Sequence, residues 1–585
     1  MFMDNQTISK LFLERSQFVL IGLTGRTGSG CTTAANILES DSPLFPSYQD
    51  ATYEGIDFYN GLSKKRYDIV KKYAEHNWEQ FYSIKVSDLL SAYLLSLNKN
   101  DMADFIFNSY TGSSVTKKQI KNLLKKGVFK NNYIVSNFAD FQTHILDHHI
   151  DKRLKKKRSE RFIRYLKLVR KFTNDFKKEL TDLSTDLYIS TYQAAGQSVR
   201  KLGKVDANYE KLEFSPDNVF HLPETINRIV KIIRAVKNRA FVVIDAIRNP
   251  YEARFFRDRY SAFYLVSINA TSKDRSKYLK NTRKFTADQI KEMDLKESGK
   301  YDKKSNKEAL KHKEFIGQNV KKCIEISDIH LFNPRNEINN HNVLKSQLAW
   351  YFSLMLHPGL ISPTPLERVM QFAYTAKTNS GCISRQVGAV ITDSNYSVKA
   401  IGWNDVPQGQ EPCSLRSVDG LLNDFDPVIY SEYERNDKTL RAEAVKKFKN
   451  ILIESEDLGG RNPAYCFKDL KNAIEPDEKN QVHTRSLHAE ENAFLQIVKY
   501  GGQAIEGGKL FTTASPCELC AKKAYQLGIK EIIYIDPYPG IAIDHILSIG
   551  SKPPTLIQFR GAVGKGYHQL YEPTLPYKDE LEYFL

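Results

Sequence analysis

The chain has 585 residues and a formal net charge of +16, with 41% hydrophobic and 26% charged residues. This is the composition of a globular protein with room for several domains. Its apolar runs are too short to span a bilayer, and seven cysteines in so long a chain argue against a disulfide framework. The first residues also lack the basic start and apolar core of a signal peptide, so we expect a cytoplasmic protein. The positive charge favours anionic partners such as nucleotides or nucleic acid.

The first predicted elements are typical of an α/β fold. Residues 18–25 read as a buried strand that leads through a glycine-rich turn into a helix near Thr32. A second apolar strand, 241–244, ends at Asp245, and a third covers 263–268. The alternation of strands and helices predicts a mostly parallel sheet.

The glycine-rich turn, residues 25–32, matches the phosphate-binding pattern G-x-x-x-x-G-K-[ST] except that Cys31 replaces the lysine. Backbone N–H groups of such a loop hold phosphates, while Thr32 and Asp245 are suited to Mg²⁺. Because the lysine's charge is absent, the pattern favours nucleotide binding over kinase or NTPase turnover, and a purely structural loop remains the alternative. The candidate nucleotide-binding residues are Gly25, Gly28, Ser29, Gly30, Cys31, Thr32 and Asp245.

A long insertion, about 62–238, separates the first two strands and is predicted to be helical. Within it, residues 151–171 contain eleven Lys or Arg and two acidic residues, with apolar residues interleaved. Either this is a solvated helix face or it is a contact surface for RNA or another polyanion.

The rest of the first domain, residues 1–345, contains less distinctive segments. The polar stretch 280–313 predicts a loop, 323–326 predicts a strand, and a helix is expected from about residue 341.

Prolines between residues 358 and 365 mark a boundary, so the second domain is predicted to cover 360–585. Its predicted elements alternate in the order of a small α/β/α sandwich. They are a helix after Pro365, strands at 387–391 and 398–403, a helix from His488, a strand at 510–513, a helix from Cys517 and a strand at 531–535.

The strongest chemical signal is His488-Ala489-Glu490 followed by Pro516-Cys517-Glu518-Leu519-Cys520. One imidazole and two thiolates make a three-ligand zinc site, which leaves the fourth position open for water. Glu490 is then free for general acid and base work on that water. A structural zinc knuckle is the alternative, but it would need a fourth protein ligand and has no use for Glu490. The pattern is that of the zinc-dependent nucleobase deaminases.

Residues 488–493, His-Ala-Glu-Glu-Asn-Ala, together with 385–391 and 402–404, resemble motifs of deoxycytidylate deaminases over about 220 residues from Pro363 onward. The resemblance implies that Asn404 binds the deoxyribose hydroxyl and that Asp405 departs from the glycine common in that family. It further implies that the backbone of Ala389 and Ala489 contacts the pyrimidine and that Thr512 and Ser515 line the pocket.

The same resemblance implies a second, structural zinc. Its four ligands would be Cys382, Cys413, Cys466 and His483. The alternative is that these cysteines are buried hydrophobic residues.

Residues 243–250 look like a strand and loop of nucleoside-monophosphate-kinase-like domains. A kinase-like domain followed by a deoxycytidylate deaminase domain resembles the bacterial anti-phage dCTP deaminases. That resemblance implies deamination of dCTP or dCMP during infection, a regulatory N-terminal domain and room for an inhibitory RNA. We also expect a homo-oligomer. The competing interpretations are a polynucleotide cytidine or adenosine deaminase, and a kinase-like or RNA-binding regulator with a vestigial deaminase domain.

Overall fold

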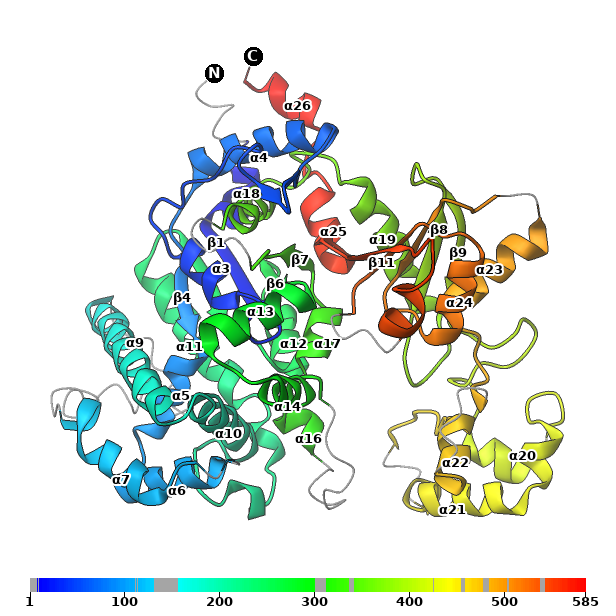
Figure 1. The fold of residues 1–585 in the computed structure, drawn as a ribbon, viewed down its shortest axis with the longest axis horizontal. Helices are drawn as coiled ribbons and strands as arrows, with labels where there is room; N and C mark the ends of the chain where they lie inside the picture. Colours follow the sequence, from blue (N-terminus) through cyan, green and yellow to red (C-terminus); the bar gives the residue numbers. More distant parts are fainter. Residues whose placement is uncertain are drawn as a thin grey trace. The chain divides into compact units, whose positions relative to one another are not determined.

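The computed structural model divides into two compact units, unit 1 (residues 1–363 and 560–585) and unit 2 (residues 364–559) (Figure 1). The residues that the structure describes are 8, 10–110, 112, 114–130, 156–299, 312–335, 341–424, 426–453, 458–476, 483–501, 504–536 and 542–584. Both units combine sheets with helices, which confirms the predicted α/β class. Among the described helices, none is long and apolar enough to cross a membrane.

Unit 1 is built on a six-stranded sheet in the order β13-β7-β6-β1-β5-β4. All ladders except β13–β7 are parallel. The central strand β1 is buried along its whole length, as expected for a parallel sheet covered on both faces. The strands are β1 (Phe18–Thr24), β4 (Tyr82–Lys85), β5 (Ala240–Asp245), β6 (Phe263–Asn269), β7 (Ile329–Phe332) and β13 (Gly561–Ala562), and β2 (Thr52–Tyr53) and β3 (Ile56–Asp57) form a separate hairpin.

Two hydrophobic cores cover the two faces of this sheet, because neighbouring residues of a strand point to opposite sides. Leu20 and Val242 face a core formed with α5, α9, α10 and α11, whereas Ile21 and Val243 face one formed with α3, α4 and α18. The helices of unit 1 are α2 (Leu13–Gln17), α3 (Cys31–Leu38), α4 (Leu62–Asn77), α5 (Val86–Leu94), α6 (Lys99–Ser109), α7 (Lys117–Lys125), α9 (Lys156–Leu183), α10 (Leu187–Leu202), α11 (His221–Val236), α12 (Pro250–Arg259), α13 (Ser272–Arg283), α14 (Ala287–Glu297), α16 (Lys313–Ile316), α17 (Val320–Glu325), α18 (Asn342–Leu356), α25 (Gly564–Tyr571) and α26 (Tyr577–Glu582).

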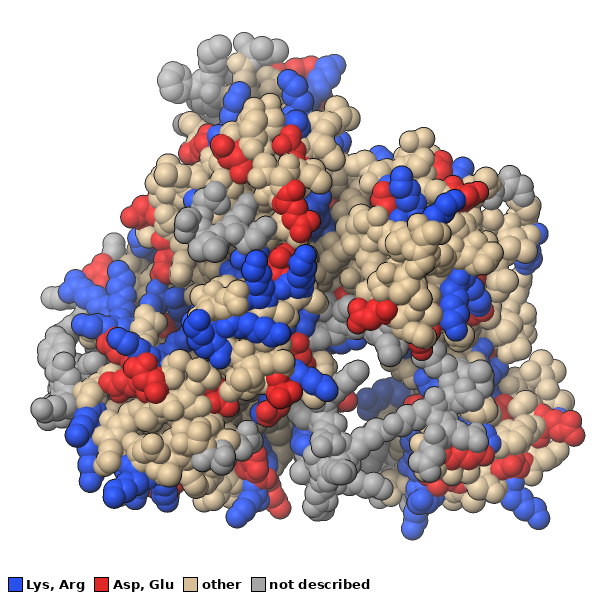
Figure 2. All heavy atoms as spheres, viewed as in Figure 1, with Lys and Arg blue, Asp and Glu red and all other residues tan. Residues whose placement is uncertain are grey.

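The basic segment of the insertion forms most of α9, and its residues before 156 lie outside the described part of the chain. Phe162, Val169 and Phe172 recur at helical spacing and are buried in the core, whereas Lys167 and Lys171 are exposed on the outer side of the helix. On the face drawn in Figure 2, Lys and Arg side chains also gather over α13. The insertion is not wholly helical, because it supplies the edge strand β4.

Two further expectations for unit 1 are wrong. Residues 323–326 do not form a strand: helix α17 ends at Glu325, and the strand β7 begins only at Ile329. The stretch 280–313 is predicted to be a loop, but most of its residues 280–299 are helical. Thr286 forms a capping box at the start of α14, and Ile290 and Met293 are buried on one side of that helix. Residues 300–311 lie outside the described residues.

The last residues of the chain belong to unit 1, contrary to the predicted domain 360–585. Strand β13 pairs with β7, Leu570 is buried in the core, and His357 Nε2 lies 2.9 Å from Glu580 Oε1. These contacts join positions more than 200 residues apart, so no local pattern could predict them.

Unit 2 contains a five-stranded sheet in the order β12-β11-β10-β8-β9, in which β8 runs antiparallel to both neighbours. Its strands are β8 (Gly388–Thr392), β9 (Val398–Trp403), β10 (Lys509–Thr512), β11 (Glu531–Tyr534) and β12 (Thr555–Gln558). Its helices are α19 (Pro365–Ala376), α20 (Glu432–Asn436), α21 (Lys438–Ile453), α22 (Phe467–Ile474), α23 (Ala489–Tyr500) and α24 (Glu518–Gln526).

Two glycines show how closely the helices of unit 2 approach opposite faces of this sheet. A Cβ atom at Gly388 would lie 2.0 Å from the carbonyl oxygen of Ala373 in α19. A Cβ atom at Gly402 would lie 2.3 Å from the carbonyl oxygen of Ala489 in α23. The sheet is therefore sandwiched between α19 and α23, as Figure 1 shows.

Candidate active site

The three predicted zinc ligands lie at the N-terminal ends of two helices of unit 2. His488 precedes α23, Cys517 precedes α24, and Cys520 lies in the first turn of α24. The Nδ1 atom of His488 is 3.2 Å from Cys517 Sγ and 3.4 Å from Cys520 Sγ. In a tetrahedral site with ordinary zinc bonds, a nitrogen and a sulfur ligand are separated by about 3.6 Å. The residues therefore fit a zinc ion.

The thiol groups of Cys517 and Cys520 have pKa values shifted in opposite directions. Hydrogen bonds from Cys520 and His488 lower the pKa of Cys517 to about 4, against the opposing effect of burial. The pKa of Cys520 is raised, first because its thiol hydrogen-bonds to Cys517 and then because it is buried. One sulfur thus already has the thiolate character that a zinc ligand needs, and metal binding would release the proton of the other.

Glu490 points into the interior beside these ligands. It is 4% exposed, and the Thr512 hydroxyl donates to its Oε1 atom at 3.2 Å. Burial raises the pKa of this carboxyl group. In the described part of the chain, the group of residues able to hold a metal ion consists of His488, Cys517 and Cys520 without Glu490. The carboxyl group is therefore placed to accept and return protons rather than to bind the metal.

Contacts that sequence reasoning missed hold α23 in place. Asn492 Nδ2 donates to the carbonyl oxygen of Trp403 at 2.9 Å, and Glu491 forms an ion pair with Lys523 of α24. The donor Asn492 and the acid Glu491 both lie inside the motif of residues 488–493, so the motif was the signal that could have found them. They link the helix that carries His488 and Glu490 to β9 and α24.

Most of the predicted substrate residues gather near Glu490. Ala389 in β8 is paired with Thr512 in β10, and Ala389 and Ala489 belong to one buried cluster. Ser515 is half-buried in the segment between β10 and α24. The contacts of these residues with a substrate stay predictions.

Asn404 has a different local role from the one expected. Its Oδ1 atom accepts from the Val387 amide at 2.6 Å, and its Nδ2 atom donates to the Arg385 carbonyl at 2.7 Å. The side chain is buried and ties the end of β9 to the segment before β8. A contact with a sugar hydroxyl would use the second hydrogen or lone pair of this amide and stays a prediction.

The predicted structural zinc site is only partly assembled. Cys382, Cys413 and Cys466 line one cavity of about 30 Å³, whereas His483 is not among its lining residues. Within the described residues, the potential metal ligands that lie within 4.8 Å of one another are His488, Cys517 and Cys520. A second zinc therefore stays a prediction.

In unit 1 the predicted phosphate loop opens onto a cavity of about 450 Å³. The cavity lies where β1 and β5 end, which is where ligands bind in open parallel sheets. Gly28 and Gly30 have φ angles of +89° and +116°, conformations that favour glycine. The Thr32 hydroxyl hydrogen-bonds to Asp245, whose pKa is raised by burial. The structure thus brings together the two residues predicted to hold Mg²⁺.

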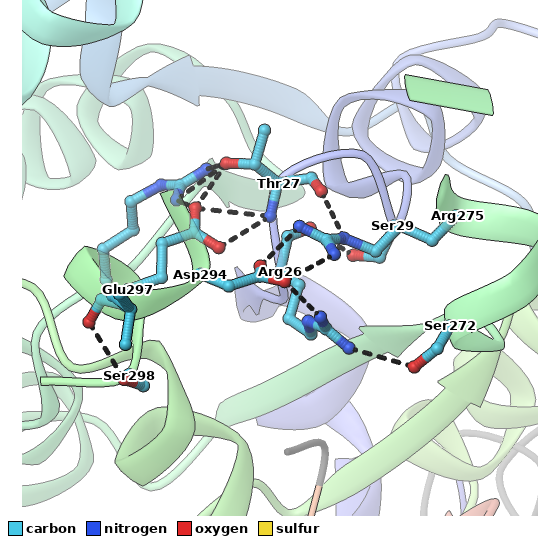
Figure 3. Close-up of polar contacts among 10 residues, drawn as sticks. Arg26, Thr27, Ser29, Ser272, Arg275, Asp294, Glu297 and Ser298 are labelled. Atoms are coloured by element: carbon cyan, nitrogen blue, oxygen red, sulfur yellow. Dashed lines mark hydrogen bonds and ion pairs between the residues drawn. The ribbon is translucent and has the colours of Figure 1, made fainter. Parts of the chain in front are cut away.

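Helix α14 anchors this loop, as Figure 3 shows. The Thr27 amide donates to Glu297 Oε2 at 3.0 Å, and Glu297 is fully buried and also paired with Arg248. Asp294 of the same helix binds Arg26 at 2.6 Å and Arg275 at 2.7 Å. Sequence reasoning missed these acids because α14 lies in a stretch whose polarity predicted a loop. Gly25 and Ser29 lie in the turn between β1 and α3, and Cys31 is the first residue of α3.

Comparison with known proteins agrees with the geometry of unit 2. Residues 363–536 match the family model described as "Cytidine and deoxycytidylate deaminase zinc-binding region". A deoxycytidylate deaminase of Enterobacteria phage T2 is 28% identical over 176 residues, which cover 29% of this chain and 79% of the relative. A probable deoxycytidylate deaminase of Drosophila melanogaster is 41% identical over 150 residues, 26% of this chain and 48% of the relative.

Among solved structures, the dCMP deaminase of cyanophage S-TIM5 in its apo form is similar to this chain at 21% identity. The similarity covers 34% of this chain and 100% of that one, with a TM-score of 0.20.

The site and the sequence matches together define a zinc-dependent hydrolytic deaminase. More specifically, residues 363–536 constitute a deaminase region of the cytidine and deoxycytidylate class.

Proposed function

We propose that unit 2 converts dCMP to dUMP and ammonia by hydrolysis. The observation that carries this proposal is the buried carboxyl group of Glu490 beside the cluster of His488, Cys517 and Cys520. The names of the relatives in phage T2 and Drosophila melanogaster support a deoxycytidylate substrate.

A zinc ion held by the three ligands would supply an acidified water molecule as the nucleophile. Glu490 takes a proton from the attacking water and delivers it to N3 of the pyrimidine. The oxygen forms a bond to C4, a second proton passes through Glu490 to the amino group, and the C4–N4 bond breaks to release ammonia. Thr512 orients the carboxyl group throughout, because its hydroxyl donates to Oε1.

Finer parts of the proposal rest on resemblance to the anti-phage deaminases. They are that dCTP is also a substrate, that its depletion in the cytoplasm starves a phage of a DNA precursor, and that the enzyme is a homo-oligomer inhibited by RNA at the basic insertion. A nucleotide with Mg²⁺ at the loop of unit 1 would regulate the deaminase. Support for this last part comes from the glycine conformations and from the contact between Thr32 and Asp245.

The runner-up is a polynucleotide deaminase, which the basic helix α9 favours. The purified chain should be incubated with dCMP, dCTP, CMP and single-stranded DNA and RNA oligonucleotides while ammonia release is measured. We expect ammonia from dCMP or dCTP and none from the Glu490→Ala variant. Ammonia from oligonucleotides alone would replace the proposal with the runner-up, and ammonia from no substrate would favour a vestigial domain.

A further inference from the structure

The cavity beside the phosphate loop contains positive charge that the loop itself does not provide. Lys177 of α9, Arg283 at the end of α13 and Arg335 after β7 all line it. Among the described residues, none of these three is in an ion pair with a carboxylate. The cavity's other cations are neutralised, since Arg26 pairs with Asp294, Arg200 with Glu252, and Arg248 with Glu297.

Arg335 lies where the phosphate loop lacks its lysine. A Cβ atom at Gly30 would be 3.2 Å from Arg335 Nη1, so the guanidinium group contacts the residue that precedes Cys31 and α3. The ring of Tyr278 stacks against this group at 3.8 Å, and the Nε atom of Arg335 is buried without a hydrogen-bond partner. The guanidinium group is therefore held at the N-terminal end of α3, where an anion is favoured.

The unpaired cations also affect each other. Burial and the neighbouring charge of Arg283 lower the pKa of Lys177. Burial lowers the pKa of Arg335 too, and Arg283 adds to that effect. Like charges in a partly buried cavity are unfavourable without an anion between them.

The charge and shape of the cavity fit one class of ligand. Asp245 is the only acidic residue among its described lining residues, so three unpaired cations and one carboxylate leave a formal charge of +2. A nucleoside triphosphate with one bound Mg²⁺ carries a charge of about −2, and Thr32 and Asp245 are suited to that ion. The same cavity is also lined by Leu90, Tyr188, Ile189, Tyr192 and Gly196, an apolar and aromatic surface suited to a base. Lys177 Nζ lies over the ring of Tyr188, 4.7 Å from its centroid, so this surface adjoins the cations.

We propose that this cavity binds a nucleoside triphosphate whose phosphate chain is held by Lys177, Arg283 and Arg335 in place of the missing loop lysine. The inference rests on the proposed binding of a nucleotide to unit 1. Because α9 belongs to the long insertion, a nucleotide bound in this cavity contacts both that insertion and the phosphate loop.

The test is binding of Mg–ATP, Mg–dCTP, Mg–dTTP and inorganic tripolyphosphate to the full chain by calorimetry. Arg335→Gln and Lys177→Gln should each weaken the binding of the tightest nucleotide about 10- to 100-fold. Lys178→Gln is the matched control, because Lys178 is the next residue of α9 and is exposed. It should bind like the wild type. Thermal unfolding of each variant checks that it is folded.

A compensating variant makes the test independent of damage to the fold. Cys31→Lys restores the lysine of the loop motif, so Cys31→Lys in the Arg335→Gln background should recover about tenfold in affinity. If it recovers none, Arg335 does not act in place of that lysine.

The remaining outcomes separate this inference from the proposal on which it rests. Wild-type affinity in Arg335→Gln and Lys177→Gln, with loss of binding in Thr32→Ala, would overturn the inference and leave the nucleotide site of the loop standing. A wild-type chain that binds none of the probes would overturn both. Tripolyphosphate bound as tightly as every nucleotide would overturn the assignment of the apolar part to a base.

Discussion

Replacing Gly402 by alanine tests whether the close approach of β9 and α23 positions the catalytic residues. The added Cβ atom would lie 2.3 Å from the carbonyl oxygen of Ala489 and 2.5 Å from the amide nitrogen of Ala493. Ordinary contact requires about 3.4 Å, so α23 must move by roughly 1 Å. That movement carries His488 and Glu490 with it. We expect a loss of about 1–3 kcal/mol in stability and about a 100-fold loss in kcat, because a 1 Å error in a reacting group has that effect.

The assay is ammonia release from dCMP, with zinc content and thermal unfolding measured on the same preparations. Gly508→Ala is the control, because its Cβ atom would lie 2.4 Å from the carbonyl oxygen of Thr392. That overlap strains the same sheet at the end away from Thr512. The control should lose stability but keep kcat and zinc. If Gly402→Ala keeps wild-type kcat and zinc affinity, the argument that this contact positions α23 is refuted.

Further substitutions address the metal sites and the stability of unit 2. Glu490→Gln should lose activity by at least about 100-fold while zinc content stays at the wild-type level, and loss of zinc in this variant would make Glu490 a ligand. Cys517→Ala should lose both zinc and activity, so metal analysis that finds catalytic zinc in the variant would contradict the ligand assignment. Cys466→Ser should lower the zinc content from two ions to one per chain, and a wild-type content of one would reject the second site. Arg416 and Glu434 are almost completely buried, and Arg416 Nη2 lies 2.6 Å from Glu434 Oε1. Arg416→Met should therefore lower the free energy of unfolding by about 3–5 kcal/mol, measured by denaturant titration. Burial opposes ionisation of Glu434, but Arg416 holds its pKa below the usual value. The stabilisation from this lowered pKa is fully present above the pKa of the unfolded state and is lost as the pH falls through the pKa of the folded state. The Arg416→Met variant should therefore lose less stability in acid than the wild type does.

Local chemistry in the sequence predicted the main features of both sites. The spacing of His488, Glu490 and Cys517 specifies a metal-dependent proton transfer, because each residue type has one strong chemical role there. The glycines before Cys31 specify a loop with backbone groups turned toward an anion, because few other residues adopt the required φ angles. Apolar strands and their order along the chain predicted the α/β class.

Contacts between distant segments lay outside such patterns. Only the fold shows that β13 pairs with β7, that Glu297 is the buried partner of the Thr27 amide, and that Asn404 uses its amide on the backbone of residues 385–387. In each case the interaction is set by two positions that are near in space and unrelated in local sequence.

The same reason separates what the sequence alone determined from what the tertiary structure decided. The missing lysine at Cys31 is visible in the sequence, but its replacement by Arg335 and Lys177 is not. Arg335 follows β7 and Lys177 lies in α9, and the distance of these elements from the loop is set by the order of strands in the sheet and by the packing of the insertion on its face. A motif encodes a local conformation, whereas the electrostatic field of a cavity depends on every element that packs around it.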